Sequence, residues 1–196
     1  DIDREQLGGL MAETDHTVRF VDEPLSIDNV VPEAEVISGF ITSAVTAEHM
    51  DLMPELRLIA CRSTGFNHVD VAAAKERNIA VTYVPAYGDH TVAEYALTLL
   101  LALSRKLMPT VKAVSDMDVD PLELVGVDLY QRTFGVIGAG RIGQTAAQIA
   151  VGFGMKVIAY DPYPNQEKAD RIGFEFVDFE TLIRESDVIS LHVPFT

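Results

Sequence analysis

The sequence contains one cysteine, Cys61, among 196 residues, and it has no long apolar run. A single cysteine excludes internal disulfides, and this scarcity fits the reducing cytoplasm, where we expect the protein to reside. The longest strongly apolar stretch, Tyr95–Leu103, is too short to span a bilayer. No basic segment followed by an apolar stretch marks the N-terminus, so we also expect no signal peptide.

Positive charge is scarce as well. The chain has 15 Lys and Arg residues against 30 Asp and Glu residues, which gives a net charge of −15. A surface of this sign repels nucleic acid phosphates and anionic membranes, so we expect neither as a partner. The low lysine content fits a high-salt cytoplasm and an ordinary acidic protein equally well.

Several catalytic signatures are missing. The sequence has no HExxH, no CxxC, no closely spaced set of carboxylates and no GxSxG, so we expect no metal site and no serine nucleophile of that type. None of the histidines stands in a motif that assigns it a catalytic role; these are His16, His49, His68, His90 and His192.

The most informative stretch is Thr133–Pro162, which reads TFGVIGAGRIGQTAAQIAVGFGMKVIAYDP. It predicts a strand, a glycine-rich turn, a helix, a second strand and an acidic residue, in the order that a dinucleotide site requires. Gly138 permits the tight turn, Gly140 lets a pyrophosphate approach the backbone, and Gly143 lets the helix pack closely on the strand. The helix begins near Arg141, so its N-terminal N–H groups face the phosphates.

Asp161 ends the second strand, 21 residues after Gly140, close to the spacing of about 20 expected for a ribose-binding acid. A carboxylate there accepts hydrogen bonds from the ribose hydroxyls and repels a 2′-phosphate. The sequence therefore predicts NAD rather than NADP as the cofactor.

The rest of the chain alternates between strand and helix patterns, which predicts an α/β protein with parallel sheets. A long helix over 90–106 joins a first domain, residues 1–105, to a second domain, residues 106–196. Residues 108–130 are expected to form an irregular connecting arm. The expected strands of the first domain are His16–Val21, Val36–Phe40, Leu58–Arg62 and Ile79–Val84, and its expected helices are Ala47–Leu52 and Asp70–Arg77.

Only three strands are expected after Arg132, the last of them over Asp187–Val193, with a short helix before it at Asp178–Glu185. A doubly wound dinucleotide domain has about six strands. We therefore expect the second domain to contain only its first half, and we expect a strand to be missing before the helix-like segment Asp1–Gly9.

These residues together give the chain a family resemblance. It resembles the D-isomer-specific 2-hydroxyacid dehydrogenases, especially their D-lactate dehydrogenase branch. The resemblance lies in STGFNHVD at 63–70, in VPAY at 84–87 followed by TVAE at 91–94, in the glycine fingerprint, and in SDVISLHVPFT at 186–196. It implies a flavodoxin-like substrate domain and a partial Rossmann-type NAD-binding domain.

The resemblance also implies roles for individual residues. Backbone N–H groups at Thr64 and Gly65 would hold the carboxylate of a small 2-keto or 2-hydroxy acid, and Tyr87 would reach the substrate. The implied cofactor residues are Gly138, Gly140, Arg141, Ile142, Gly143, Asp161, Val193 and Pro194.

The family's catalytic arginine, glutamate and histidine lie beyond the position of Thr196, so we expect no catalytic residue within this chain. The leading hypothesis is that the intact protein is an NAD-dependent dehydrogenase that forms a homodimer. Two alternatives stay open: an NAD-sensing, corepressor-like binding protein of the same fold, and a fragment without activity.

Overall fold

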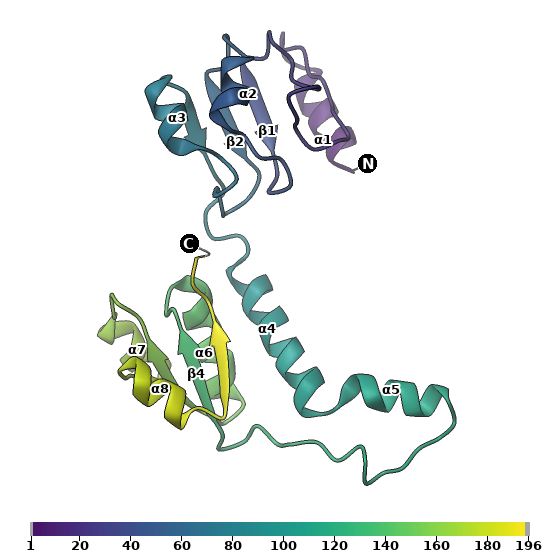
Figure 1. The fold of residues 1–196 in the computed structure, drawn as a ribbon, viewed down its shortest axis with the longest axis vertical. Coiled ribbons are helices and arrows are strands. Elements are labelled where there is room, and N and C mark those ends of the chain that lie inside the picture. The colour runs from purple at the N-terminus through teal and green to yellow at the C-terminus, as the bar shows by residue number, and fades with distance from the viewer. Residues whose placement is uncertain (1, 195–196) are drawn as a thin grey trace. The chain divides into compact units, whose positions relative to one another are not determined.

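The chain forms two compact units, residues 1–85 and 86–196, shown in the computed structural model of Figure 1, which describes residues 2–194. The long helix α4 (Asp89–Ser104) belongs to the second unit, although we expected it to close the first domain. It joins the second unit because its buried residues Ala93 and Leu97 share a core with the second sheet.

The first unit is built on a three-stranded parallel sheet in the order β1-β2-β3. The central strand β2 contributes Ile59 and Cys61 to a buried core, which Met50 and Met53 cover. The side chain of Asp70 caps α3 by accepting the N–H of Ala73 at 2.9 Å. The elements are α1 (Ile2–Met11), β1 (Val36–Gly39), α2 (Ala47–Asp51), β2 (Leu58–Cys61), α3 (Val71–Glu76) and β3 (Ala80–Thr82).

The strand expected at His16–Val21 is not formed, and this prediction was wrong. Its alternating apolar residues Val18 and Phe20 are exposed, and the Phe20 ring lies beneath the guanidinium group of Arg4, at 5.5 Å. A period of two marks a strand only where a neighbouring strand supplies hydrogen-bond partners.

The second unit has a four-stranded parallel sheet in the order β6-β5-β4-β7. Successive strands run outward from β4 to β6, and the chain then crosses back to place β7 on the other side of β4. The strand order therefore reverses at β4. The elements after α4 are α5 (Leu107–Ser115), β4 (Thr133–Ile137), α6 (Arg141–Gly152), β5 (Lys156–Tyr160), α7 (Gln166–Ile172), β6 (Glu175–Phe176), α8 (Phe179–Glu185) and β7 (Val188–Leu191).

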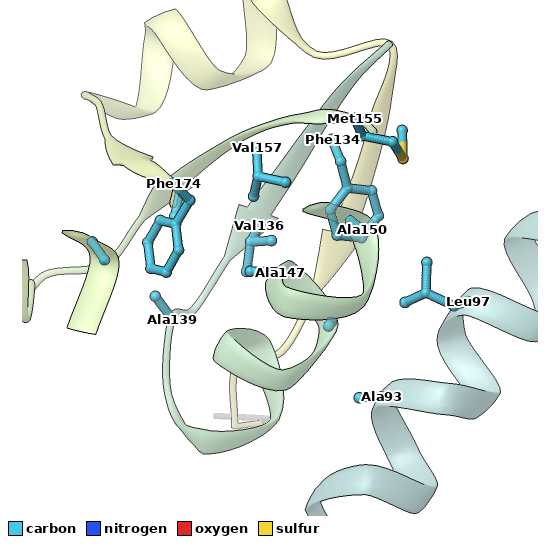
Figure 2. Packing of buried hydrophobic residues seen from close by; sticks show 13 residues of the cluster. Ala93, Leu97, Phe134, Val136, Ala139, Ala147, Ala150, Met155, Val157 and Phe174 are labelled. Carbon is cyan, nitrogen blue, oxygen red and sulfur yellow. The ribbon is translucent and has the colours of Figure 1, made fainter. Parts of the chain in front are cut away.

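Helices cover both faces of this sheet because side chains of β4 alternate between them. Phe134 and Val136 point toward α6 and share a core with Ala147 and Ala150, as Figure 2 shows. A Cβ on Gly135, between them, would collide with α8 and with Ser186. Small residues thus let both helices pack close to the sheet.

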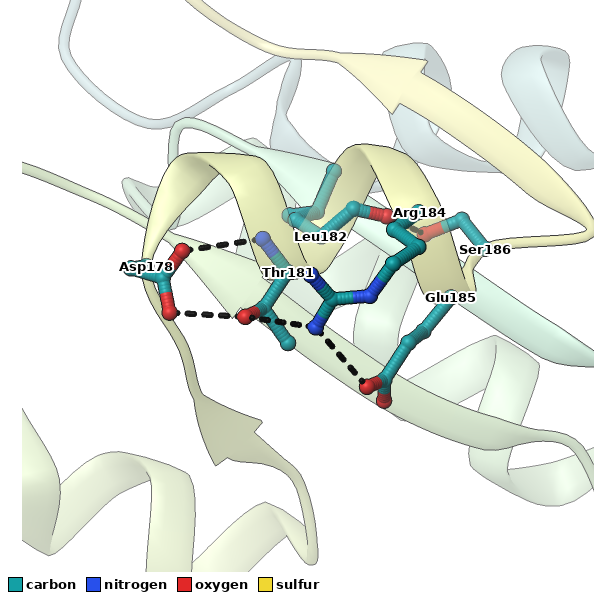
Figure 3. Close-up of polar contacts among 6 residues, drawn as sticks. All are labelled: Asp178, Thr181, Leu182, Arg184, Glu185 and Ser186. Atoms are coloured by element: carbon teal, nitrogen blue, oxygen red, sulfur yellow. Dashed lines mark hydrogen bonds and ion pairs between the residues drawn. The ribbon is translucent and has the colours of Figure 1, made fainter.

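Helix α8 is fixed at both ends by its own side chains (Figure 3). The Asp178 carboxylate accepts the Thr181 N–H at 2.9 Å and the Thr181 hydroxyl at 2.7 Å, and these two bonds lower the pKa of Asp178. The Ser186 hydroxyl donates to the Leu182 carbonyl at 2.7 Å. The helix therefore begins and ends at residues that its sequence specifies.

Two expectations for the second unit were wrong, and one helix was missed. Residues 108–115 of the expected arm lie in α5, where Pro109 stands in the first helical turn and its missing N–H costs nothing. Helix α7 was not expected. The sheet has four strands after Arg132, not three, because β6 has only two residues, too few to give a pattern.

Candidate functional site

The turn after β4 depends on Gly138, whose φ is +90°. Its N–H donates to the Tyr160 carbonyl at 2.9 Å, which joins the turn to the end of β5. A Cβ on Gly138 would lie 2.6 Å from the carbonyl oxygen of His192. Only glycine combines this backbone conformation with this close approach.

Gly140 and Gly143 occupy different surroundings. Gly140 precedes α6 with an extended backbone, and a Cβ built on it meets no described atom within 4 Å. A Cβ on Gly143 would instead collide with the Gly138 carbonyl and approach Val136 to 3.1 Å. Gly143 therefore keeps α6 close to β4, whereas Gly140 leaves open space in front of the helix.

That open space faces the N-terminus of α6, which no side chain of the described residues caps. The first N–H groups of a helix have no partner within it, and its dipole places partial positive charge there. The space beside Gly140 and the uncapped N–H groups suit a dianionic group such as a pyrophosphate.

Asp161 follows β5 at the same edge of the sheet. Ile137 of β4 and Tyr160 of β5 are register partners, so Gly138 and Asp161 leave neighbouring strands side by side. Oδ1 of the half-buried Asp161 carboxylate accepts the N–H of Tyr163 at 2.8 Å. This bond orients the carboxylate, which keeps acceptor positions for hydroxyl donors.

The segment after β7 lies on the other side of the glycine turn. The His192 N–H donates to the Ile137 carbonyl at 2.8 Å, and Cγ1 of Val193 would lie 2.8 Å from a Cβ on Gly138. Val193 and Pro194 are exposed. The three segments that follow β4, β5 and β7 thus meet where the strand order reverses, which is where open α/β sheets bind ligands.

The His192 side chain is half-buried, and its Nε2 lies 2.9 Å from the Ser190 hydroxyl. Burial lowers the pKa of the imidazole below its ordinary value of 6.5. The ring is therefore predominantly neutral at pH 7 and adds no charge to this edge of the sheet.

The Arg141 side chain turns away from this crevice. Its Nε donates to the Asp89 carboxylate of α4 at 2.8 Å. The pair borders a groove of about 510 Å³ along the outer side of α6, which also involves Arg171 of α7 but neither Gly138 nor Asp161. At the N-terminus of α6, Arg141 therefore offers its backbone N–H group rather than its side chain, and Ile142 offers a second backbone N–H group.

In the first unit, the loop after β2 brings Thr64 and Gly65 together. The buried Ser63 hydroxyl donates to the Gly65 carbonyl at 2.7 Å, and the Thr64 hydroxyl donates to the Val84 carbonyl at 2.9 Å. Gly65 is exposed. Tyr87, the third residue expected at a substrate site, lies in the second unit and is 58% exposed.

Sequence reasoning did not single out Ser63 or Tyr83. Ser63 precedes Thr64 directly, and its buried hydroxyl fixes the loop. Tyr83 follows β3, and its ring packs against Phe66 at a centroid distance of 5.2 Å. The sequence signal that could have indicated Tyr83 is its position as an aromatic residue directly before VPAY at 84–87.

No three His, Cys, Asp or Glu side chains of residues 2–194 lie where they could hold a metal ion, and none of the helices in this range is long and apolar enough to cross a membrane. Burial in β2 raises the pKa of the Cys61 thiol, so this cysteine is a protonated core residue.

The second unit is therefore a nucleotide-binding unit of the doubly wound class. Residues 97–196 match the model of the D-isomer specific 2-hydroxyacid dehydrogenase, NAD binding domain. The chain belongs to this family, and residues 97–196 are its NAD-binding domain. This confirms the family resemblance, the α/β fold with parallel sheets and the expectation of NAD.

Individual relatives agree with this assignment. The chain is 39% identical over 186 residues to a 2-hydroxyacid dehydrogenase homolog of Zymomonas mobilis, covering 92% of this chain and 56% of the relative. It is 39% identical over 173 residues to the glyoxylate reductase of Thermococcus litoralis, covering 85% of this chain and 52% of the relative.

Among solved structures, D-lactate dehydrogenase from Aquifex aeolicus, complexed with NAD and lactic acid, superposes with a TM-score of 0.87 at 34% identity. The match covers 100% of this chain and 57% of that one. The chain thus spans little more than half the length of these relatives.

Proposed function

We propose that the intact protein is an NAD-dependent oxidoreductase that interconverts a small 2-keto acid and its D-2-hydroxy acid. The observation that supports this most is the meeting of three segments, after β4, β5 and β7, around the uncapped N-terminus of α6 in a chain of this family. The intact protein would combine this site with catalytic residues outside the chain.

The roles of the cofactor residues follow from their geometry. Gly138 shapes the turn, Gly140 admits the pyrophosphate, and Gly143 keeps α6 on the sheet. The backbone N–H groups of Arg141 and Ile142 would bind the phosphates. Asp161 would accept the ribose hydroxyls, and Val193 and Pro194 would line the nicotinamide half. NAD, when bound, supplies the hydride acceptor or donor.

The substrate residues would be Thr64, Gly65 and Tyr87. Backbone N–H groups at Thr64 and Gly65 would suit a carboxylate, because successive N–H groups in a turn form an anion site. The lactic acid complex of the Aquifex aeolicus relative and the glyoxylate reductase name of the Thermococcus litoralis relative both support a small acid. We favour a pyruvate-like substrate over glyoxylate because the aromatic residue Phe66 directly follows Gly65.

Turnover of the full-length protein tests this function. We expect NADH oxidation with pyruvate, at a kcat/KM above that with glyoxylate. A preference for glyoxylate would contradict the substrate assignment alone. Saturable NADH binding with no turnover of any 2-keto acid would instead favour the NAD-sensing alternative.

Gly140→Ala tests the pyrophosphate position separately from folding. The new Cβ meets no described atom within 4 Å, so we expect stability to stay within about 0.5 kcal/mol of the parent. NADH affinity should fall at least about tenfold, because the methyl group occupies the space that the pyrophosphate needs. Gly152→Ala, at an equally open position in α6, is the control and should leave NADH affinity unchanged.

The domain roles are also a proposal. The first unit would provide the substrate domain, expected over 1–105, and the second the NAD-binding domain, expected over 106–196. The family match from residue 97 and the packing of Ala93 and Leu97 in the second core support a boundary near the start of α4.

We further propose that the protein is a homodimer of the cytoplasm with neither nucleic acid nor membrane partners. Helix α4 exposes an apolar stripe of Val92, Tyr95, Leu99 and Leu103, of which Leu103 is 79% exposed. Helix α5 adds exposed apolar residues and buries none of its described residues. Apolar patches of this kind mark protein interfaces, which supports the dimer. The single buried cysteine supports the cytoplasmic location. The net charge of −15 supports the lack of nucleic acid and membrane partners.

Light scattering of the full-length protein tests the dimer. We expect a dimer mass for the parent and a monomer mass for Leu103→Glu combined with Val111→Glu. Ile183→Glu, at an exposed apolar position on α8 outside this stripe, should stay dimeric. A monomeric parent at micromolar concentration would overturn the proposal.

A further inference from the structure

Two aromatic rings meet beside the loop that holds Thr64 and Gly65. Phe66 directly follows Gly65, and Tyr83 directly follows β3. Their ring centroids are 5.2 Å apart with planes inclined at 45°. Phe66 is 38% exposed and Tyr83 is 48% exposed, so the pair forms part of the surface of the first unit rather than its core.

The backbone around this pair is fixed on both sides. The Val84 N–H donates to the Ser63 carbonyl at 3.1 Å, and the Thr64 hydroxyl donates back to the Val84 carbonyl at 2.9 Å. The Val69 N–H donates to the Phe66 carbonyl at 3.0 Å. The two segments are therefore held in register, and Tyr83 stands opposite Phe66 as a consequence.

The Phe66 side chain is less firmly fixed than the backbone around it. No described hydrogen bond can fix the apolar ring of Phe66, so its orientation depends on packing, and Tyr83 provides an aromatic contact at the spacing that such pairs prefer. Without that contact, the backbone bonds would keep the loop in place while the Phe66 ring gained rotamer freedom.

We propose that Tyr83 is a specificity-determining positioning residue: it holds the Phe66 ring beside the Thr64–Gly65 carboxylate loop, where the ring limits the size of the substrate side chain. The inference rests on the proposed function. A fixed ring next to the carboxylate anchor accepts a methyl group and rejects a longer or charged substituent, since the apolar Phe66 ring offers no partner for charge.

The test uses the full-length protein and four 2-keto acids: glyoxylate, pyruvate, 2-oxobutyrate and phenylpyruvate. Tyr83→Ala should raise the KM for pyruvate about 3- to 10-fold, the range of an aromatic contact, with kcat within about twofold. It should also lower the ratio of kcat/KM for pyruvate to kcat/KM for 2-oxobutyrate. Tyr83→Phe keeps the ring and should behave like the parent. Affinity for NADH should not change.

A double-mutant cycle shows whether Tyr83 acts through Phe66. Phe66→Ala should lower the same selectivity, and adding Tyr83→Ala should then change it little. Phe153→Ala, an aromatic residue of matched 39% exposure in the second unit, is the control. If Tyr83→Ala melts below the assay temperature, Tyr83→Leu takes its place in the cycle.

Two results would overturn the proposal, and they are distinguishable. Unchanged selectivity in Tyr83→Ala, with an active parent, would contradict the role of Tyr83 and leave the proposed function intact. A parent enzyme that turns over none of the four acids would contradict the proposed function, and the positioning role would fail with it.

Discussion

At the scale of single residues, the glycine motif separates into three physical requirements. Gly138 is needed for its positive φ and for the close approach of the His192 carbonyl, Gly143 for helix packing, and Gly140 for open space. The motif letters do not distinguish these requirements. Substitutions at Gly138 and Gly143 should therefore lower stability, whereas a substitution at Gly140 should lower NADH affinity.

Gly138→Ala should lower the free energy of unfolding by at least about 1–3 kcal/mol, the cost of a non-glycine residue in a strained backbone region. The collision with the His192 carbonyl adds to it. Chemical denaturation of the full-length protein measures the loss. Stability equal to that of Gly140→Ala would contradict the distinction between the two sites.

Asp161→Ala should weaken NADH binding about 10- to 100-fold, which is the value of hydrogen bonds to a charged acceptor. NADPH binding should weaken less or improve, because the repulsion of a 2′-phosphate is removed. Titration calorimetry with both cofactors gives the ratio. An unchanged ratio would remove Asp161 from the ribose site.

His192 should make stability depend on pH. Its pKa is lowered in the folded state by burial, so protons bind preferentially to the unfolded chain. The contribution of neutral His192 to the free energy of unfolding is complete above pH 6.5, the ordinary pKa. It is lost as the pH falls through the lower pKa of the folded state. His192→Asn should flatten the stability profile between about pH 7 and pH 5, as urea titrations at several pH values would reveal.

At the scale of elements, local signals predicted the regular core of both units. Helices were expected to begin at Asp70 and at Asp178, and α3 and α8 begin there, each capped by that carboxylate, which accepts a backbone N–H. The fingerprint likewise predicted β4, α6 and β5. These elements are specified by residues within a few positions of their ends.

The wrong predictions concern segments whose structure depends on partners far away in the sequence. His16–Val21 has strand periodicity but pairs with no strand of residues 2–194, and β6 exists only because two residues pair with β5. The sequence also predicted Thr64 and Gly65 as one loop, but it did not indicate that Tyr83, from another strand, packs beside them. Contacts between distant segments depend on the fold and leave no local pattern.

The packing of α4 on α6 gives a prediction at this scale. Leu97 is 3% exposed in the second core, so Leu97→Ala should cost about 2–5 kcal/mol through lost burial and a cavity. Thr98→Ala, exposed on the same helix, should stay within about 0.5 kcal/mol of the parent. A Leu97→Ala variant as stable as the parent would mean that α4 does not depend on the second core.

At the scale of the whole molecule, the two units have separate cores and present different features. The first presents the Thr64–Gly65 loop and an aromatic pair, and the second presents the crevice where β4, β5 and β7 end. Because the strand order reverses at β4, the segments after those strands meet although they lie far apart in the sequence. The position of the proposed cofactor site thus depends on the topology as much as on the motif.

Hydrogen exchange of the full-length protein, with and without NADH, tests this central claim most directly. Saturating NADH should slow exchange at residues 138–143, at 161–163 and in the segment after β7, and should leave the outer groove beside Arg171 unchanged. Saturable binding with protection confined to that groove, or with none at residues 138–143, would contradict the assignment of the site.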